Sequence, residues 1–159
     1  MIEVHVQARG LRAKRLAPRV KREALVFLEQ LKVRNAELSI ALVGDAAIRR
    51  LNREWRDKDK ATDVLSFPGG ELPKGVPGPR PLGDVIISVD TAVRRAKSHG
   101  VTVAEEVALY LAHGILHLLG HDHELGEREA KAMARLEAKL LAAVGLADRP
   151  GLIRRTHEA

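Results

Sequence analysis

One stretch constrains this chain more than any other: Thr102 to His123, TVAEEVALYLAHGILHLLGHDH. Thr102 followed three residues later by Glu105 forms a capping box, so a helix has a marked start here. Gly120 marks its end, because glycine readily takes the left-handed conformation that terminates many helices. Apolar residues occupy nearly every side of the helical wheel in between, which is typical of a helix buried in a core. The glutamates and histidines within it argue against a membrane span.

The histidines of this stretch are spaced as metal ligands. His113 and His117 are four residues apart, so they project from the same face of the helix, one turn apart. The chain breaks at Gly120 and can fold back, which lets His123 approach the same point. Three protein nitrogens with an open fourth position are the arrangement of a catalytic zinc ion. We therefore predict one Zn²⁺ per chain on these histidines, although nickel or another divalent ion also suits imidazole.

Gly114 distinguishes this pattern from that of the metalloproteases. Their H-E-x-x-H pattern places the general base directly after the first histidine, where this chain has glycine. Two explanations are open: close packing of the helix against a neighbour, or space beside the metal for a bulky substrate. In either case the protease base is missing, which argues against peptide hydrolysis by the usual route.

Three blocks of the sequence resemble one protein family. HGILHLLGHDH, residues 113–123, is similar to the H-G-x-L-H-L-x-G-x-D-H signature of the YbeY family of endoribonucleases and ribosomal RNA maturation factors. LNREWRDKDKATDVLSFP at 51–68 and LGDVI at 82–86 resemble two further motifs, in the family's order and spacing. The resemblance implies an α+β fold with a small mixed sheet. It also implies a single-strand-specific endoribonuclease in 16S ribosomal RNA 3′ end maturation and ribosome quality control.

The resemblance also assigns roles to individual residues. Arg56 matches the arginine implicated in catalysis in the family, and a guanidinium suits the charge that develops on a phosphodiester during cleavage. Asp122, between two histidines, is a candidate to orient an imidazole or to act as general base; the alternative is an ordinary turn-forming aspartate. His121 lies at a position that the signature leaves free, so we interpret it as a neighbour of the ligands.

Composition fits a nucleic-acid partner. The 159 residues carry 27 basic and 21 acidic side chains, a net charge of +6 that suits a phosphate backbone, although a generic basic surface is the alternative. The chain has no cysteine, so nitrogen or oxygen must hold any zinc. Its start lacks the pattern of a signal peptide, and we expect a soluble cytoplasmic protein.

The remaining sequence alternates between strand and helix patterns. We expect one α+β domain over residues 1–159, with about four strands packed with several helices around the buried histidine helix. The expected strands are 2–6, 38–42, 62–67 and 84–88, and 69–82 is a long loop rich in proline and glycine. The other expected helices are 18–31, 45–58, 89–98 and 124–144.

The side chains of two of these helices can be assigned to faces from their spacing. In 45–58, Asp45 can cap the helix, and Ile48, Leu51 and Trp55 should pack inward. Arg49, Arg53 and Arg56 form a basic stripe on the same helix, and a stripe of this kind is usually solvated. In 89–98 we also prefer a solvated face for the basic residues, Arg94, Arg95 and Lys97.

Three functions remain open from the sequence. The first is a zinc-dependent endoribonuclease acting on single-stranded, ribosomal RNA, with ribosomal particles or proteins as partners. The second is a metallohydrolase of another substrate, peptide or small molecule. The third is a ribosome assembly factor whose zinc is structural; such a site normally has four protein ligands, and the sequence offers three.

Overall fold

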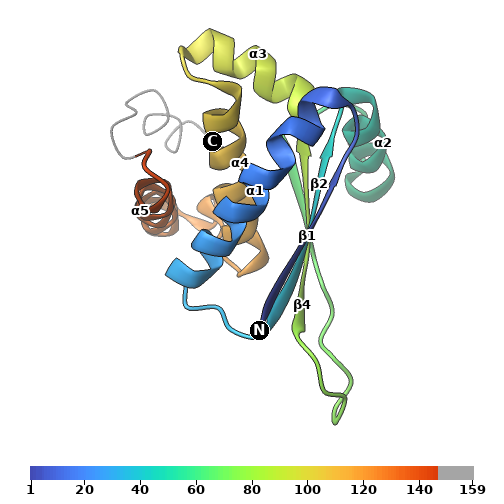
Figure 1. The fold of residues 1–159 in the computed structure, drawn as a ribbon, viewed down its shortest axis with the longest axis vertical. Helices are drawn as coiled ribbons and strands as arrows, with labels where there is room; N and C mark the ends of the chain where they lie inside the picture. Colours follow the sequence, from blue (N-terminus) through green and yellow to red (C-terminus); the bar gives the residue numbers. More distant parts are fainter. Residues whose placement is uncertain (147–159) are drawn as a thin grey trace.

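The computed structural model of the chain describes residues 1–146, apart from the side chain of His123 (Figure 1). Its strands are β1 (Ile2–Ala8), β2 (Ala36–Val43), β3 (Val64–Pro68) and β4 (Arg80–Ser88). Its helices are α1 (Leu11–Gln30), α2 (Asp45–Arg56), α3 (Val89–His99), α4 (Val103–Leu118), the 3-10 helix η1 (His123–Leu125) and α5 (Glu127–Ala143). The expected α+β fold is confirmed.

The four strands form one mixed sheet in the order β1-β2-β4-β3. β1 pairs with β2 and β2 with β4 in parallel, whereas β3 runs antiparallel to β4 along the free edge. The parallel pair β1–β2 is joined through α1, which provides the crossover that such a pair requires. The sequence predicted a mixed sheet of about four strands, and the structure confirms it. The order of the strands in the sheet is known only from the structure.

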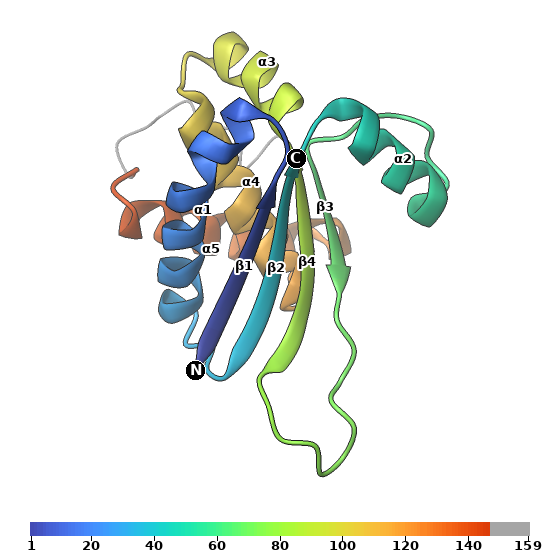
Figure 2. The same cartoon turned by 45° about the vertical axis from the view of Figure 1, so that its right-hand side comes forward.

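The two faces of the sheet are covered very differently. α1, α4 and α5 lie on one side of the sheet, and α2 lies on the other side near β3 and β4 (Figures 1 and 2). Leu38, Ile40 and Leu42 of β2 are at most 2% exposed and join the main core with α1 and α4. The opposite face has only a small apolar cluster around Ile48 of α2. Much of that face is therefore open to solvent.

The histidine helix α4 begins and ends as its sequence predicts. Thr102 Oγ1 accepts a hydrogen bond from the Glu105 backbone N–H at 3.1 Å, and Glu105 Oε1 accepts one from the Thr102 N–H at 2.9 Å. Gly120, with φ of 94°, lies in the left-handed region just after the helix. Within residues 1–146, no single helix is long and apolar enough to cross a bilayer; α3 and α4 reach that criterion only together, across a 116° bend.

Two predicted boundaries are wrong. α1 begins at Leu11, not at Pro18, because burial of Ala13, 2% exposed, outweighs the hydrogen bond that an interior proline loses. β4 begins at Arg80, inside the predicted 69–82 loop, because it pairs with β2 on one side and β3 on the other. The remaining loop joins β3 to β4 and projects beyond the end of the sheet (Figure 2).

Two predictions for α2 are also wrong. The helix is capped at Gly44 without a side-chain hydrogen bond, so Asp45 is not the cap. Ile48 packs inward as expected and is fully buried, but Trp55 is 70% exposed. Trp55 contacts the ring of Phe67 in β3 edge-on, with the centroids 6.4 Å apart, and this contact leaves most of the indole exposed.

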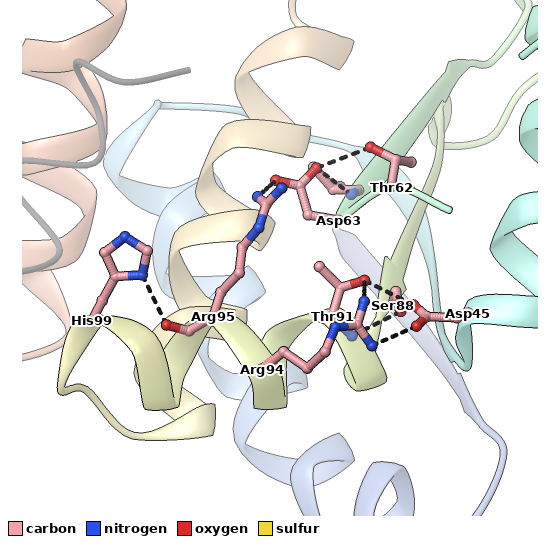
Figure 3. A network of polar contacts seen from close by, with 9 residues as sticks. Asp45, Thr62, Asp63, Ser88, Thr91, Arg94, Arg95 and His99 are labelled. Carbon is pink, nitrogen blue, oxygen red and sulfur yellow. Dashed lines mark hydrogen bonds and ion pairs between the residues drawn. The ribbon is translucent and has the colours of Figure 1, made fainter. Parts of the chain in front are cut away.

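Asp45 is instead the centre of a polar network that joins α2 to α3 (Figure 3). Its carboxylate accepts hydrogen bonds from Ser88 Oγ at 2.6 Å and Thr91 Oγ1 at 2.7 Å, and it pairs with Arg94 at 2.6 Å. Burial opposes ionisation of Asp45, but the hydrogen bonds from Ser88, Arg94 and Thr91 hold its pKa below the ordinary value. Arg94 is nevertheless exposed, as the preference for a solvated basic face on α3 expects; what the spacing did not reveal is its acidic partner.

Arg95 is exposed too, and it likewise has an acidic partner. The guanidinium of Arg95 pairs with Asp63, just before β3, at 2.7 Å (Figure 3). The other carboxylate oxygen of Asp63 accepts from the Val64 N–H at 2.8 Å and from the Thr62 hydroxyl at 3.3 Å. These contacts fix the entry into β3, the strand that borders the histidines.

Candidate active site

His113 and His117 meet on one face of α4, as their spacing predicts. Their Nε2 atoms are 3.1 Å apart, and both side chains are half-buried. Two imidazole nitrogens bound to one tetrahedral zinc ion, each at about 2.0–2.1 Å, lie about 3.3 Å apart. The described pair therefore fits two positions of a tetrahedral metal site.

A carboxylate that the sequence reading missed holds one of these rings. Glu137 of α5 places Oε1 2.7 Å from His113 Nδ1, and the glutamate is only 2% exposed. A carboxylate on the far nitrogen directs Nε2 toward the metal, as in many zinc sites. The sequence did contain a signal: Glu137 lies on the apolar stripe of its helix, one turn after Met133 and one turn before Leu141.

The residues after α4 follow the predicted turn. The backbone of His123 begins η1, directly after the turn at Gly120, while its side chain lies outside the described part of the structure. Asp122 caps η1: its Oδ1 accepts a hydrogen bond from the Glu124 N–H at 2.8 Å. His121 is half-buried, and its backbone N–H closes the end of α4 on the Leu116 carbonyl at 3.0 Å.

The histidine pair opens into a pocket of about 260 Å³ between α4, β3 and the end of α2. Arg56, the last residue of α2, lines it, and its guanidinium donates a 2.7 Å hydrogen bond to the Ser66 carbonyl of β3. This contact uses one of the five N–H donors of the side chain. Asp63, fixed by Arg95, lines the same pocket.

The other two arginines of the basic stripe do not line this pocket. Arg49 forms an exposed ion pair with Asp59 at 2.9 Å. Asp59 raises the pKa of that guanidinium, and Arg49 in turn lowers the pKa of Asp59. Arg53 is exposed. Among the three, only Arg56 lies next to the histidines.

Gly114 is held tightly against the sheet. A β-carbon there would lie 2.7 Å from Val85 Cγ1, and Ser66 Oγ donates to the Gly114 carbonyl at 3.1 Å. The close-packing explanation of this glycine is confirmed, and the alternative of open space beside the metal is wrong. A glutamate at this position, as in the metalloprotease pattern, would collide with β4.

A second group of ligand-type side chains lies far from this pocket. Glu3, His5 and Glu37 place one ligand atom each within 4.8 Å of one another on the open face of β1 and β2. Among the side chains that the structure describes, this is the one group of three possible metal ligands with their ligand atoms this close together. Its members are exposed or half-buried, and no buried carboxylate orients the imidazole.

Comparison with known proteins identifies close relatives. The family model described as endoribonuclease YbeY matches residues 2–145. Endoribonuclease YbeY from Myxococcus xanthus is 65% identical over 123 residues, which are 77% of this chain and 42% of that protein. The Anaeromyxobacter dehalogenans protein of the same name is 58% identical over 83% of this chain and 66% of its own length. The Azorhizobium caulinodans protein is 48% identical over 86% and 84%.

A solved structure shares the fold. The solution structure of TM1509 from Thermotoga maritima matches with a TM-score of 0.64 and 26% identity, covering 91% of this chain and 89% of that one. The chain thus spans less than half the length of the Myxococcus relative but most of the length of TM1509.

Proposed function

The chain belongs to the YbeY family, and from this premise we propose that it is a zinc-dependent endoribonuclease that cleaves single-stranded RNA. The observation that carries the proposal is one pocket whose lining includes both Arg56 and two convergent imidazoles. A metal-binding pair next to a guanidinium suits a phosphodiester, whose charge grows as its bond is cleaved. The relatives named above are called endoribonucleases, which supports the same reading.

We propose that His113, His117 and His123 hold the zinc ion. The 3.1 Å separation of the first two Nε2 atoms supports this assignment, as does the position of His123 after the turn. A zinc ion bound there would act as a Lewis acid on the phosphate and lower the pKa of water to about 7. Glu137 would hold the His113 ring by its Nδ1 and leave Nε2 to bind the zinc ion.

Arg56 is proposed to bind the phosphate whose bond is broken. Its hydrogen bond to the Ser66 carbonyl holds the guanidinium in the lining of the pocket, and the remaining donors can meet two phosphate oxygens together. Asp122 is proposed as a second carboxylate near the site, either orienting His123 or accepting a proton. Its present hydrogen bond to the Glu124 N–H uses one of its oxygens.

The substrate is proposed to be ribosomal RNA, including the 3′ end of 16S ribosomal RNA. The net charge of +6 supports a phosphate-rich partner. We further propose that the protein works in the cytoplasm, in contact with ribosomal particles, and that residues 1–159 form one functional domain. Hydrolysis of peptides is disfavoured, because the packing of Gly114 leaves no place for the protease base.

The test uses metal-loaded protein and a defined single-stranded RNA oligomer. The unaltered chain should cleave it, and both His117→Ala and Arg56→Ala should abolish cleavage, with the fold and the metal retained in Arg56→Ala. If Arg56 supplied only diffuse attraction, lowering the salt would restore cleavage by that variant. Failure of the metal-loaded chain to cleave any single-stranded RNA would instead favour the assembly factor with a structural zinc.

The fragments also reveal the nucleophile. Attack by water gives ends without a cyclic phosphate, whereas attack by the RNA 2′-hydroxyl first gives a 2′,3′-cyclic phosphate. We expect water attack, because three histidine ligands leave a coordination position open. Mass spectrometry of the fragments checks this expectation, and an oligomer with 2′-deoxyribose at the cut site should still be cleaved.

A further inference from the structure

A second pocket lies on the opposite face of β3 from the histidines. It has a volume of about 350 Å³ and is lined by Leu51, Trp55, Phe67, Asp84 and Ile86. Pockets that bind small ligands have volumes from about 300 Å³ upward, and they combine apolar walls with a few polar groups. Here the walls are apolar and aromatic, and Asp84 is the one charged side chain among the lining residues.

The aromatic side chains of this pocket are unusual for this chain. The sequence contains one tryptophan and two phenylalanines, and the tryptophan, Trp55, is 70% exposed beside one of the phenylalanines, Phe67. Their ring centroids are 6.4 Å apart at an interplanar angle of 64°. Leaving an indole in water forgoes the free energy of its burial, so an exposed tryptophan at a pocket suggests a surface that is covered by a ligand.

Arg56 connects this pocket to the histidine pocket. Successive side chains of β3 point to opposite faces: Ser66 contacts α4, and Phe67 faces the α2 side. The Arg56 guanidinium spans both, since it donates to the Ser66 carbonyl and its central carbon lies 5.4 Å from the centre of the Phe67 ring. An RNA strand that binds Arg56 through one phosphate therefore has a neighbouring nucleotide within reach of Trp55 and Phe67.

We propose that this second pocket binds one base of the RNA, a nucleotide adjacent to the cleaved bond, and that it prefers guanine. The inference rests on the proposed function, because it extends the RNA path from the histidine pocket. Single-stranded RNA is recognised by stacking of its bases on exposed aromatic side chains next to cationic groups that bind the backbone. Trp55 and Phe67 provide the stacking surface, and Arg56 provides the cation.

Asp84 supplies the preference. It is the register partner of Phe67 across β3 and β4, so its carboxylate stands beside the ring on the same face. No hydrogen bond or ion pair of the described residues occupies that carboxylate. The pairing edge of guanine carries two adjacent N–H donors, which a carboxylate accepts together, whereas adenine and cytosine each place an acceptor beside their amino group. Uracil offers one donor between two carbonyls.

The experiment uses Trp55 as its own probe, because it is the only tryptophan of the chain. The chain of residues 1–159, kept with EDTA so that RNA is not cleaved, is titrated with the pentanucleotides UUGUU, UUAUU, UUCUU and UUUUU. We expect UUGUU to quench the tryptophan fluorescence with the highest affinity. Phe67→Ala should weaken this binding by between about fivefold and 150-fold, the range for loss of one stacked base.

Asp84→Asn tests the polar part of the pocket. It should weaken UUGUU binding by about tenfold and leave the other three pentanucleotides unchanged, since only guanine uses both carboxylate oxygens. Glu54→Gln is the matched control: it removes an exposed acid of α2 that does not line the pocket, and it should not alter the preference. Trp55→Ala removes the fluorescent probe, so its binding is measured by the anisotropy of labelled UUGUU. This variant should lose affinity for UUGUU as Phe67→Ala does.

Two results would overturn the proposal. Equal affinity for all four pentanucleotides in the unaltered chain excludes selection by Asp84. RNA binding by anisotropy without any change in tryptophan fluorescence excludes a base in this pocket, and leaves the pocket to a protein partner. These results are distinct from a failure of the proposed function. A protein that binds UUGUU through Trp55 but never cleaves RNA would support the base-binding pocket and contradict the endoribonuclease activity. A protein that cleaves RNA without quenching of Trp55 would support the activity and contradict the pocket.

Discussion

Glu137 Oε1 lies 2.7 Å from His113 Nδ1 and thereby joins α5 to the histidine helix α4. The carboxylate is buried at 2% exposure, a costly position for a charge that has no partner. The contact with the His113 ring reduces that cost and orients the ring with Nε2 toward His117, 3.1 Å from its Nε2. The contact thus serves packing and also orients a ring that we propose as a metal ligand.

Glu137→Gln should weaken zinc binding by about 10-fold to 100-fold, because outer carboxylates of this kind raise ligand basicity and fix ring orientation. Calorimetric titration of the metal-free protein with zinc measures the effect. Glu129→Gln, an exposed glutamate on the same helix, is the matched control and should bind zinc as the unaltered chain does. Equal affinities for both variants would limit Glu137 to a role in packing.

His117→Ala should abolish stoichiometric metal binding, since it removes one of the two convergent imidazoles. Elemental analysis of protein purified without chelators gives the metal content directly. His121→Ala is the control, because His121 is a half-buried histidine close by in sequence that we do not assign as a ligand. Full occupancy in His117→Ala would place the metal elsewhere, with the Glu3, His5 and Glu37 group as the next candidate.

Gly114→Ala should destabilise the fold although alanine is the better helix former. The helix gains about 1 kcal/mol from the replacement. The added methyl group, however, meets Val85 Cγ1 at 2.7 Å, and overpacking of a core costs about 1–3 kcal/mol. Urea unfolding should show a net loss, and the loss should shrink in a Val85→Ala background, where the methyl group has room. A stability gain in the unaltered background would contradict the packing argument.

The parts of this molecule that the sequence predicted are local. The capping box at Thr102, the stop at Gly120 and the pairing of His113 with His117 depend only on the geometry of one helix and its ends. The four strands likewise follow from alternation within short segments. Such features need no knowledge of what packs against the element, and the structure agrees with them.

The parts that were missed depend on contacts between distant segments. Arg94 and Arg95 bind Asp45 and Asp63, which lie 49 and 32 residues away, so their spacing on α3 could not reveal a partner. Trp55 shares the inward spacing of Ile48, but periodicity does not say where the sheet beneath the helix ends. Glu137 was detectable as an acid on an apolar stripe, yet its partner became apparent only with α5 placed against α4.

Asp45→Asn should lower stability at neutral pH and flatten its dependence on acid. The folded-state pKa of Asp45 is lowered, so its contribution is present above the unfolded value, near 4, and is lost as the pH falls through the folded pKa. The hydrogen bonds from Ser88 and Thr91 and the pair with Arg94 then give a difference of about 1–3 kcal/mol between the two proteins at pH 7.

Urea unfolding at a series of pH values from 7 to 3 measures this difference. It should be largest above about pH 5 and should narrow as the pH falls, because the unfolded chain takes up a proton on Asp45 before the folded chain does. Asp57→Asn is the matched control, because Asp57 is exposed at the end of α2. We expect the free energy of unfolding of this variant to stay within about 0.5 kcal/mol of that of the unaltered chain. A difference for Asp45→Asn that stays constant over the whole range would mean that the network holds α2 and α3 together by shape and not by the charge of Asp45.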